Sequence, residues 1–292
     1  MKKIGFIGLG NMGSKMCVHL IKAGHDVSGY DINEKLTDEL LGHGIKKEIS
    51  ISSIAKNKDI IFTMLPNGSI VDEVLKNVLS NTINKPIIID CSTIEVDKSK
   101  ELYKLALYQK ISLLDAPVSG GTIGAKNGTL TFMVGGDQST FNEMSPILNI
   151  MGSKSVYCGE TGSGQATKLC NNMLLAITMI GVAESFNMAK KLKLDLSILF
   201  DVVSTATGSC WAVNNYCPIP NVGPLSPADN NFLPGFSAKL MAKDLNLAVD
   251  AAKTSNSNIG FGEKAKELFT KMSEGNNGDK DFSAIIEEIY NY

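Results

Sequence analysis

The chain has 292 residues, of which 43% are hydrophobic and 20% are charged, a balance typical of globular proteins with buried cores. This length suits about two domains, and the composition excludes a disordered or fibrous chain. Lysine and arginine together number 28 against 30 acidic residues, so the formal net charge is −2. The chain therefore lacks the basic excess of a nucleic-acid-binding protein, and we expect no nucleic-acid partner.

All 28 basic residues are lysines, because the sequence contains no arginine. A bound anion must therefore be held by lysine side chains, backbone N–H groups or helix N-termini. The six cysteines and three histidines show no metal-ligand spacing, so we expect reduced thiols in an intracellular protein and no metal site. The longest apolar run, residues 173–183, is too short to span a bilayer, so we expect no membrane partner.

The first half of the sequence alternates short apolar runs with segments of helical spacing. This alternation is typical of βαβ units and predicts an α/β fold, a mostly parallel sheet with helices on both faces. The predicted strands span residues 4–7, 27–30, 60–64, 87–90, 111–114 and 129–134, and the clearest predicted helices span 12–23 and 71–79.

The strand pattern ends at a glycine-rich stretch, residues 159–164, and helical spacing follows it. Predicted helices span residues 165–191, 196–203, 238–252 and 262–272, and a loop with five prolines spans 216–234. We therefore divide the chain into an α/β domain, residues 1–162, and an all-α domain, residues 163–292, joined by the long helix. Because this helix is apolar on most sides, we expect it to be buried all round.

A glycine pattern, G-x-G-x-x-G, lies between the first predicted strand and the first predicted helix. Its glycines permit a tight turn, a close approach of the backbone to a pyrophosphate and close packing of helix on strand, and the helix N-terminus attracts phosphates. Asp31 ends the next strand, where a carboxylate binds ribose hydroxyls and repels a 2′-phosphate. The sequence therefore predicts a Rossmann domain that binds NAD in preference to NADP. The pattern residues are Gly8, Leu9, Gly10, Asn11, Met12 and Gly13.

Nicotinamide chemistry needs a proton donor or acceptor beside the reacting carbon. Three common arrangements are missing from this sequence: a Tyr-x-x-x-Lys pair, a His/Arg pair and a zinc-ligand pattern. Lysine is the remaining candidate. Lys168 and Asn172 lie on one face of the long predicted helix, near its N-terminus, where the helix dipole disfavours the ammonium form. Taken in isolation, the same pair is more typical of ordinary surface side chains.

A second candidate stretch, Asp115–Gly121, follows a predicted strand. Its Ser-Gly-Gly peptides could hold a carboxylate on backbone N–H groups, or could merely turn the chain. Together with the glycine turn, residues 164–172 and Lys239–Leu245, this stretch falls in the order and spacing of the β-hydroxyacid dehydrogenases. The chain resembles that family over essentially its whole length.

The resemblance implies a role for each matching residue. Lys168 would be the general acid/base, and Asn172 would position the reacting oxygen. The substrate would be held by Ser119, Gly120, Gly121, Lys243 and Asp244. Besides the glycine turn and Asp31, the cofactor would contact Leu65, Pro66, Thr93 and Lys243.

The implied reaction is NAD-dependent oxidation of a small hydroxy acid. Within the family the chain is most similar to enzymes that convert 3-hydroxyisobutyrate to methylmalonate semialdehyde, a step of valine breakdown. The alternatives are tartronate semialdehyde reductase, succinic semialdehyde reductase, 6-phosphogluconate dehydrogenase and a non-catalytic NAD-sensing module. The family also implies a homo-oligomer, a dimer or a tetramer, in the mitochondrial matrix of eukaryotes or the bacterial cytosol.

Overall fold

The computed structural model describes residues 1–290. It divides the chain into two compact units, an N-terminal unit of residues 1–168 and a C-terminal unit that begins at Leu169.

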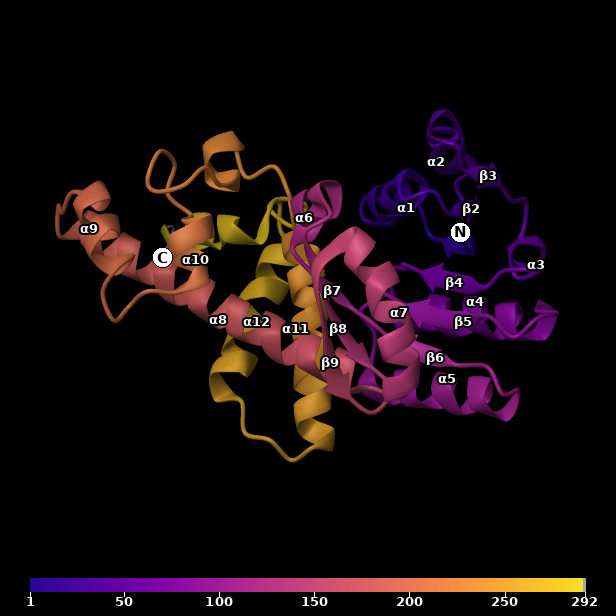
Figure 1. The fold of residues 1–292 in the computed structure, drawn as a ribbon. Coiled ribbons are helices and arrows are strands. Elements are labelled where there is room, and N and C mark those ends of the chain that lie inside the picture. Colours follow the sequence, from indigo (N-terminus) through magenta and orange to yellow (C-terminus); the bar gives the residue numbers. More distant parts are fainter. Residues whose placement is uncertain (291–292) are drawn as a thin grey trace. The chain divides into compact units, whose positions relative to one another are not determined.

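The N-terminal unit is built on one nine-stranded sheet (Figure 1). The strand order is β3-β2-β1-β4-β5-β6-β8-β7, and β9 also pairs with β8. Pairing is parallel from β3 through to β6, whereas β8 runs antiparallel to β6 and β7. The strands are β1 (Lys3–Ile7), β2 (Asp26–Tyr30), β3 (Lys46–Lys47), β4 (Ile60–Thr63), β5 (Ile87–Asp90), β6 (Leu113–Asp115), β7 (Val118–Ser119), β8 (Leu130–Gly135) and β9 (Gly152–Gly159).

Helices cover both faces of this sheet because successive strand residues point to opposite sides. Phe6 and Phe62 stack with ring centroids 5.7 Å apart on one face, which α1 and α7 cover, while Ile7 and Ile61 face the other, which α4 and α5 cover. Strands buried on two sides appear in the sequence as continuous apolar runs. The helices of this unit are α1 (Gly13–Lys22), α2 (Glu34–Asp38), α3 (Ile51–Ile54), α4 (Gly68–Asn81), α5 (Val96–Tyr108), α6 (Gly121–Asn127) and α7 (Gln138–Met151).

The parallel strands end level with one another. Ile7 pairs with Thr63, Thr63 with Asp90, and Asp90 with Asp115. The loops that follow β1, β4, β5 and β6 therefore leave the sheet at one edge. The chain reverses its direction of travel across the sheet between β1 and β4, and ligands of open α/β sheets bind at this kind of switch point.

The prediction of a mostly parallel Rossmann sheet is confirmed, with additions at one side. The sequence pattern did not predict β3, β7 or β9. In β9 all but the first residue are partly or fully exposed, and its three apolar side chains follow one another at 156–158 instead of alternating with polar ones, so its hydrophobic pattern is weak. Only pairing with the buried strand β8 makes this segment a strand.

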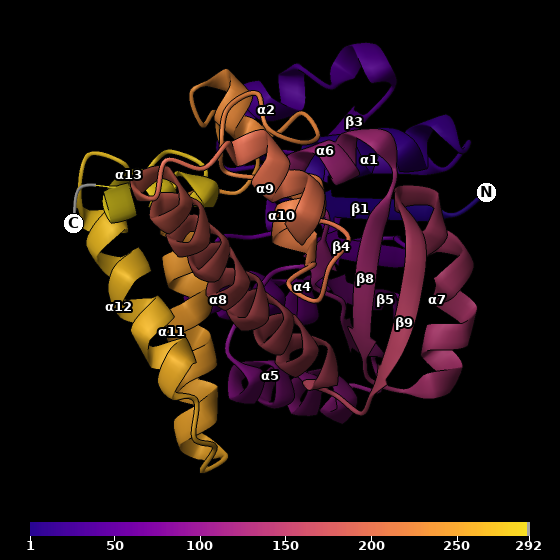
Figure 2. The same ribbon diagram turned by 90° about the vertical axis from the view of Figure 1, so that its left-hand side faces the viewer.

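The C-terminal unit is helical, and α11 packs along α12 (Figure 2). Its core includes Phe186, Met241, Leu245, Phe269 and Phe282. The predicted proline-rich loop holds only a short 3-10 turn at Pro227–Asn230. The helices are α8 (Ser163–Lys191), whose first residues belong to the N-terminal unit, α9 (Leu196–Val203), α10 (Trp211–Tyr216), α11 (Ala238–Thr254), α12 (Gly260–Glu274) and α13 (Ile285–Tyr290).

The expectation that α8 is buried all round is wrong. Ala176 and Phe186 are buried on one side of this helix, whereas Leu174 and Met188 are each 61% exposed on the other. Composition alone did not reveal which apolar side chains the chain itself covers. Within residues 1–290, α8 is the one helix long and apolar enough to cross a membrane by length and composition, a test that core helices of soluble proteins also pass.

Candidate functional site

The glycine turn between β1 and α1 has the shape that a dinucleotide requires. Gly8 has a φ of +92°, and a Cβ there would lie 2.3 Å from the Met64 carbonyl oxygen. A Cβ on Gly13 would lie 2.0 Å from the Gly8 carbonyl oxygen, so this glycine lets helix and strand meet. A Cβ on Gly10 would meet nothing within 4 Å. Gly8 and Gly13 are therefore needed by the fold, whereas Gly10 faces open space where a pyrophosphate can approach.

Asp31 is joined to this turn by its own carboxylate. Its Oδ2 accepts a hydrogen bond of 2.7 Å from the backbone N–H of Leu9, and its Oδ1 accepts one of 2.8 Å from the N–H of Asn33. The carboxylate thus lies at the end of β2, beside the glycine turn, as expected for a group that binds an adenosine ribose. No side chain caps the N-terminus of α1. The turn, the helix end and the carboxylate together fit NAD.

Two further predicted cofactor segments are held together by a buried carboxylate, Asp90. It accepts hydrogen bonds from the Thr63 hydroxyl at 2.7 Å and the Ser92 N–H at 3.1 Å. The Ser92 hydroxyl in turn accepts from the N–H of Leu65 at 2.9 Å. Burial raises the pKa of Asp90, and these donors oppose that rise. Asp90 therefore fixes the loops after β4 and β5, which also carry Pro66 and Thr93.

Lys168 lies at the same edge of the sheet, in the second turn of α8. Its side chain is buried, and Nζ donates a 2.8 Å hydrogen bond to the carbonyl oxygen of Val118. The next residues are Ser119, Gly120 and Gly121, and the two glycines have φ values of +128° and +60°. The structure therefore brings the predicted acid/base next to the loop predicted to hold the substrate carboxylate.

The first turn of α8 is attached to the sheet by two residues of the candidate stretches, Asp115 and Gln165, to which the sequence alone assigned no role of their own. Asp115, fully buried at the end of β6, accepts hydrogen bonds from the N–H groups of Gly162 and Gln165, at 2.8 and 2.9 Å. The Gln165 amide donates to the Ser92 carbonyl oxygen at 2.8 Å and accepts from the Ile94 N–H at 3.1 Å. These contacts join residues far apart in sequence, so the sequence could not predict them. The one sequence signal for Asp115 was its place at the start of the Asp-Ala-Pro-Val motif.

The C-terminal unit brings together the other three predicted residues. The Asn172 amide donates a 2.6 Å hydrogen bond to Oδ2 of Asp244, and both side chains are buried. Oδ1 of Asp244 accepts no hydrogen bond within residues 1–290, and Nζ of Lys243 lies 3.6 Å from it. The amide, the carboxylate and the ammonium thus form one polar cluster, whose unsatisfied carboxylate oxygen could accept a hydrogen bond from a ligand.

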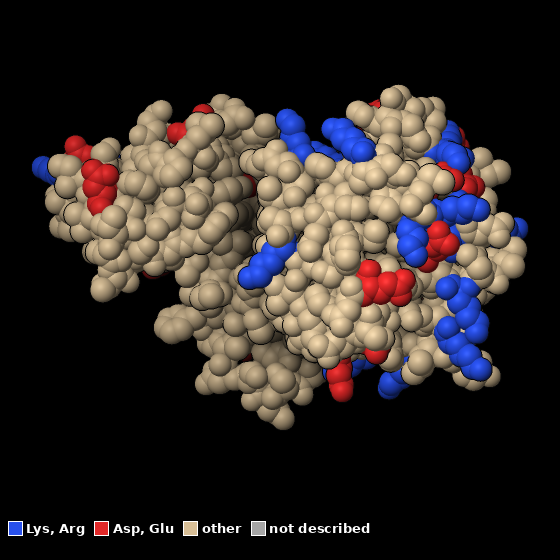
Figure 3. Space-filling model, viewed as in Figure 1, with Lys and Arg blue, Asp and Glu red and all other residues tan. Residues whose placement is uncertain are grey.

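Charged side chains elsewhere are mixed in sign. Lysines and acidic residues lie side by side over the N-terminal unit (Figure 3), and Lys47 pairs with both Glu34 and Asp38. Among residues 1–290, no group of three or more His, Cys, Asp or Glu side chains is arranged to hold a metal ion.

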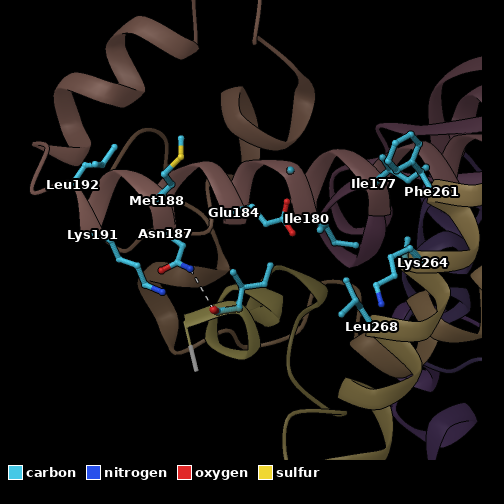
Figure 4. Close-up of a pocket in the computed structure, with 13 residues that line it drawn as sticks. Ile177, Ile180, Glu184, Asn187, Met188, Lys191, Leu192, Phe261, Lys264 and Leu268 are labelled. Carbon is cyan, nitrogen blue, oxygen red and sulfur yellow. Dashed lines mark hydrogen bonds between the residues drawn. The ribbon is translucent and has the colours of Figure 1, made fainter. Parts of the chain in front are cut away.

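A groove of about 820 Å³ lies in the C-terminal unit, apart from its polar cluster. Figure 4 shows its mainly apolar lining from α8 and α12, with Glu184 and Lys264 among the side chains. Phe261, which is 82% exposed, belongs to the lining, and so does Gly181, where a Cβ would meet nothing within 4 Å. Its lining includes no predicted site residue.

Comparison with known proteins matches both parts of the chain to dehydrogenase families. Residues 3–159 match the NAD-binding domain of 6-phosphogluconate dehydrogenase, and residues 162–289 match the family described as the NAD-binding of NADP-dependent 3-hydroxyisobutyrate dehydrogenase. The mitochondrial 3-hydroxyisobutyrate dehydrogenase of Drosophila melanogaster is 44% identical over 98% of this chain and 89% of its own length.

Bacterial relatives are similar to the same extent. A probable 3-hydroxyisobutyrate dehydrogenase of Mycobacterium tuberculosis is 43% identical over 99% of this chain and 98% of its own. The solved structure of the Mycobacterium tuberculosis 3-hydroxyisobutyrate dehydrogenase with L-serine superposes with a TM-score of 0.95, at 43% identity and 99% coverage of both chains.

Proposed function

Because the chain belongs to the 3-hydroxyisobutyrate dehydrogenase family, we propose that it oxidises 3-hydroxyisobutyrate to methylmalonate semialdehyde with NAD. The observation that carries this proposal is the fixed position of Lys168, whose Nζ donates to the carbonyl oxygen immediately before the Ser119-Gly120-Gly121 loop. An amine and a carboxylate-binding loop at one sheet edge suit a short acid that carries both a carboxylate and a hydroxyl.

The residues of this chain act on the substrate's oxygen atoms. Ser119, Gly120 and Gly121 hold the carboxylate with hydroxyl and backbone N–H groups, in place of the arginine that the sequence lacks. Neutral Lys168 accepts the hydroxyl proton as the alcohol becomes an aldehyde. Bound NAD would supply the acceptor for the hydride that leaves the carbinol carbon.

Asn172 lies one helical turn after Lys168 on α8, so the two side chains share a face of the helix. Asn172 would position the reacting oxygen, and Asp244 orients the Asn172 amide by accepting from it. Lys243 would sit by the nicotinamide and the substrate. The dinucleotide would be held by the glycine turn, Asp31, Leu65, Pro66 and Thr93. Of these residues, Asp31 would favour NAD over NADP.

The test measures the turnover of a panel of acids with NAD, and the absorbance of the NADH formed gives the rate. It contains 3-hydroxyisobutyrate, L-serine, glycerate, 4-hydroxybutyrate and 6-phosphogluconate. Turnover should be fastest with 3-hydroxyisobutyrate. A preference for glycerate or 4-hydroxybutyrate would assign the chain to a sibling reductase instead. NAD binding without turnover of any acid would indicate a sensing module.

The domain boundary that we propose, near residue 162, is supported by family matches that end at 159 and begin at 162. The eukaryotic relatives are named mitochondrial. We propose that the protein is located in the mitochondrial matrix if its source is a eukaryote, or in the cytosol if its source is a bacterium. The proposed partners are the small acid and further copies of the chain, not a membrane or a nucleic acid.

The homo-oligomer is supported by the exposed apolar side chains at the groove. Met188, Leu192 and Phe261 line the groove and are each more than half exposed in a single chain, and a partner copy would cover such residues. Light scattering should give a dimer or tetramer, and Phe261→Glu should reduce it to monomers. Tyr108→Glu, at an exposed ring of the N-terminal unit, is the matched control. A monomeric parent protein would contradict the proposal.

A further inference from the structure

Asp115 occupies the position that an N-cap side chain would occupy on α8, although it belongs to a distant strand. Gly162, directly before the helix, has no side chain and a φ of +87°. The carboxylate of Asp115 instead accepts hydrogen bonds from the N–H groups of Gly162 and Gln165. These are the donors that an isolated helix leaves unsatisfied.

The fit around this carboxylate is close on both sides. A Cβ on Gly135 would lie 2.6 Å from Oδ1 of Asp115, and one on Gly164 would lie 2.8 Å from Oδ2. Two glycines thus make the space that lets a strand end touch a helix end. The N–H groups that face Asp115 lie at the positive end of the α8 dipole, which favours a carboxylate at this position. Burial raises the pKa of Asp115, and the N–H donors oppose that rise.

Lys168 follows Gln165 by three residues, less than one turn of the helix. A helix held at its first turn by two backbone N–H groups, and by the Gln165 side chain, cannot rotate about its axis or slide along it. Its second turn then directs the Lys168 side chain to the Val118 carbonyl oxygen. Asp115 and Val118 are three residues apart in one short segment. This segment therefore both accepts the hydrogen bond of the Lys168 amine and fixes the position of α8, which carries that amine.

We propose that Asp115 is a positioning residue for the proposed dehydrogenase reaction, because its carboxylate fixes the first turn of α8 and thereby the amine of Lys168. This inference rests on the proposed function. Asp115 itself contacts no reacting atom. Its effect on the rate passes through Lys168 alone.

The experiment is a comparison of Asp115→Asn with the parent enzyme. An asparagine amide keeps the size but turns an NH₂ group toward one of the two N–H donors, so the first turn should shift. We expect kcat to fall ~10- to 100-fold, because a displacement of about 1 Å has effects of this size. The KM for NAD and the dissociation constant of NADH should stay within about two-fold of the parent.

Two controls separate positioning from stability. Asp137 caps α7 by accepting from the Thr140 N–H at 2.8 Å, so Asp137→Ala should lower the melting temperature with kcat unchanged. In a Lys168→Ala background, Asp115→Asn should cause no further loss of kcat, because the group it positions is gone. Should Asp115→Asn not fold, Gln165→Met removes the second anchor and should give the same kcat loss with an unchanged KM for NAD.

Three results would overturn the inference: an unchanged kcat per folded molecule in Asp115→Asn, a loss confined to the KM of the hydroxy acid, or a further ten-fold loss in the Lys168→Ala background. If the parent enzyme turns over no acid in the panel, the proposed function fails instead. The two failures are therefore distinguishable.

Discussion

Replacing Lys168 by alanine is the most direct test of the proposed chemistry. The substitution removes the amine that takes the hydroxyl proton, and general acid/base groups contribute ~10²–10⁴ in rate, or about 2.7–5.4 kcal/mol of barrier. The structure predicts a much smaller effect on folding. The side chain is 7% exposed and donates a hydrogen bond to the Val118 carbonyl oxygen, and we expect the loss of that hydrogen bond to lower the stability by about 1–2 kcal/mol.

The assay measures steady-state kcat and KM for 3-hydroxyisobutyrate and NAD, together with the dissociation constant of NADH by fluorescence. We expect kcat to fall as stated and NADH binding to be kept. Added methylamine should restore part of kcat, because the deleted side chain leaves room for a small amine. Lys126→Ala removes an exposed lysine from α6, close in sequence to the same loop, and should leave kcat unchanged.

Near-normal turnover in Lys168→Ala would refute the reasoning and remove this lysine from the mechanism. A loss of NADH binding parallel to the loss of kcat would also count against it, because the glycine turn and Asp31 should hold the cofactor without Lys168.

Three further outcomes follow from the geometry of single side chains. Asp31→Asn should raise the KM for NAD by ~10- to 100-fold, since a charged hydrogen-bond acceptor is lost, and should lower the preference for NAD over NADP; unchanged selectivity in steady-state assays would contradict the role of Asp31. At about pH 8, iodoacetamide should label the exposed Cys170 but not Cys17, because burial raises the pKa of the Cys17 thiol to about 12; mass spectrometry of the labelled native protein checks this, and prompt labelling of Cys17 would contradict the packing of α1. Burial raises the pKa of Asp281 above its ordinary value of 3.8, so the folded state binds this proton more tightly than the unfolded chain does. The free energy of unfolding should therefore fall as pH rises from about 3.8 through the raised pKa. Asp281→Asn should make this decline smaller in urea titrations, and an equal dependence on pH in both proteins would refute the prediction.

The sequence predicted the parts of the site whose signals are local. The glycine turn is a run of six residues between a strand and a helix, and its geometry follows from the absence of a side chain at each glycine. Lys168 and Asn172 are four residues apart, so the helix period alone places them on one face. Level strand ends in a parallel sheet then bring the loops after β4, β5 and β6 to one edge without further information.

The contacts that fix those parts were not predictable, because they join residues distant in sequence. Asp115 binds N–H groups 47 and 50 residues later, and Asn172 binds a carboxylate 72 residues later. Strand β9 was missed for a related reason: its own residues show no alternation of apolar and polar side chains, and pairing with β8 makes this segment a strand. The exposed side of α8 was missed because an apolar side chain gives the same signal whether its own chain or another covers it.

The three glycines of the turn differ in what an added methyl group would disturb. At positions 8 and 13 it would strike the protein's own backbone, whereas at position 10 it would project into open space. Gly10→Ala should therefore yield a protein that folds but does not bind the dinucleotide. Such a protein would separate the properties of the cofactor-free fold from those that depend on a bound cofactor.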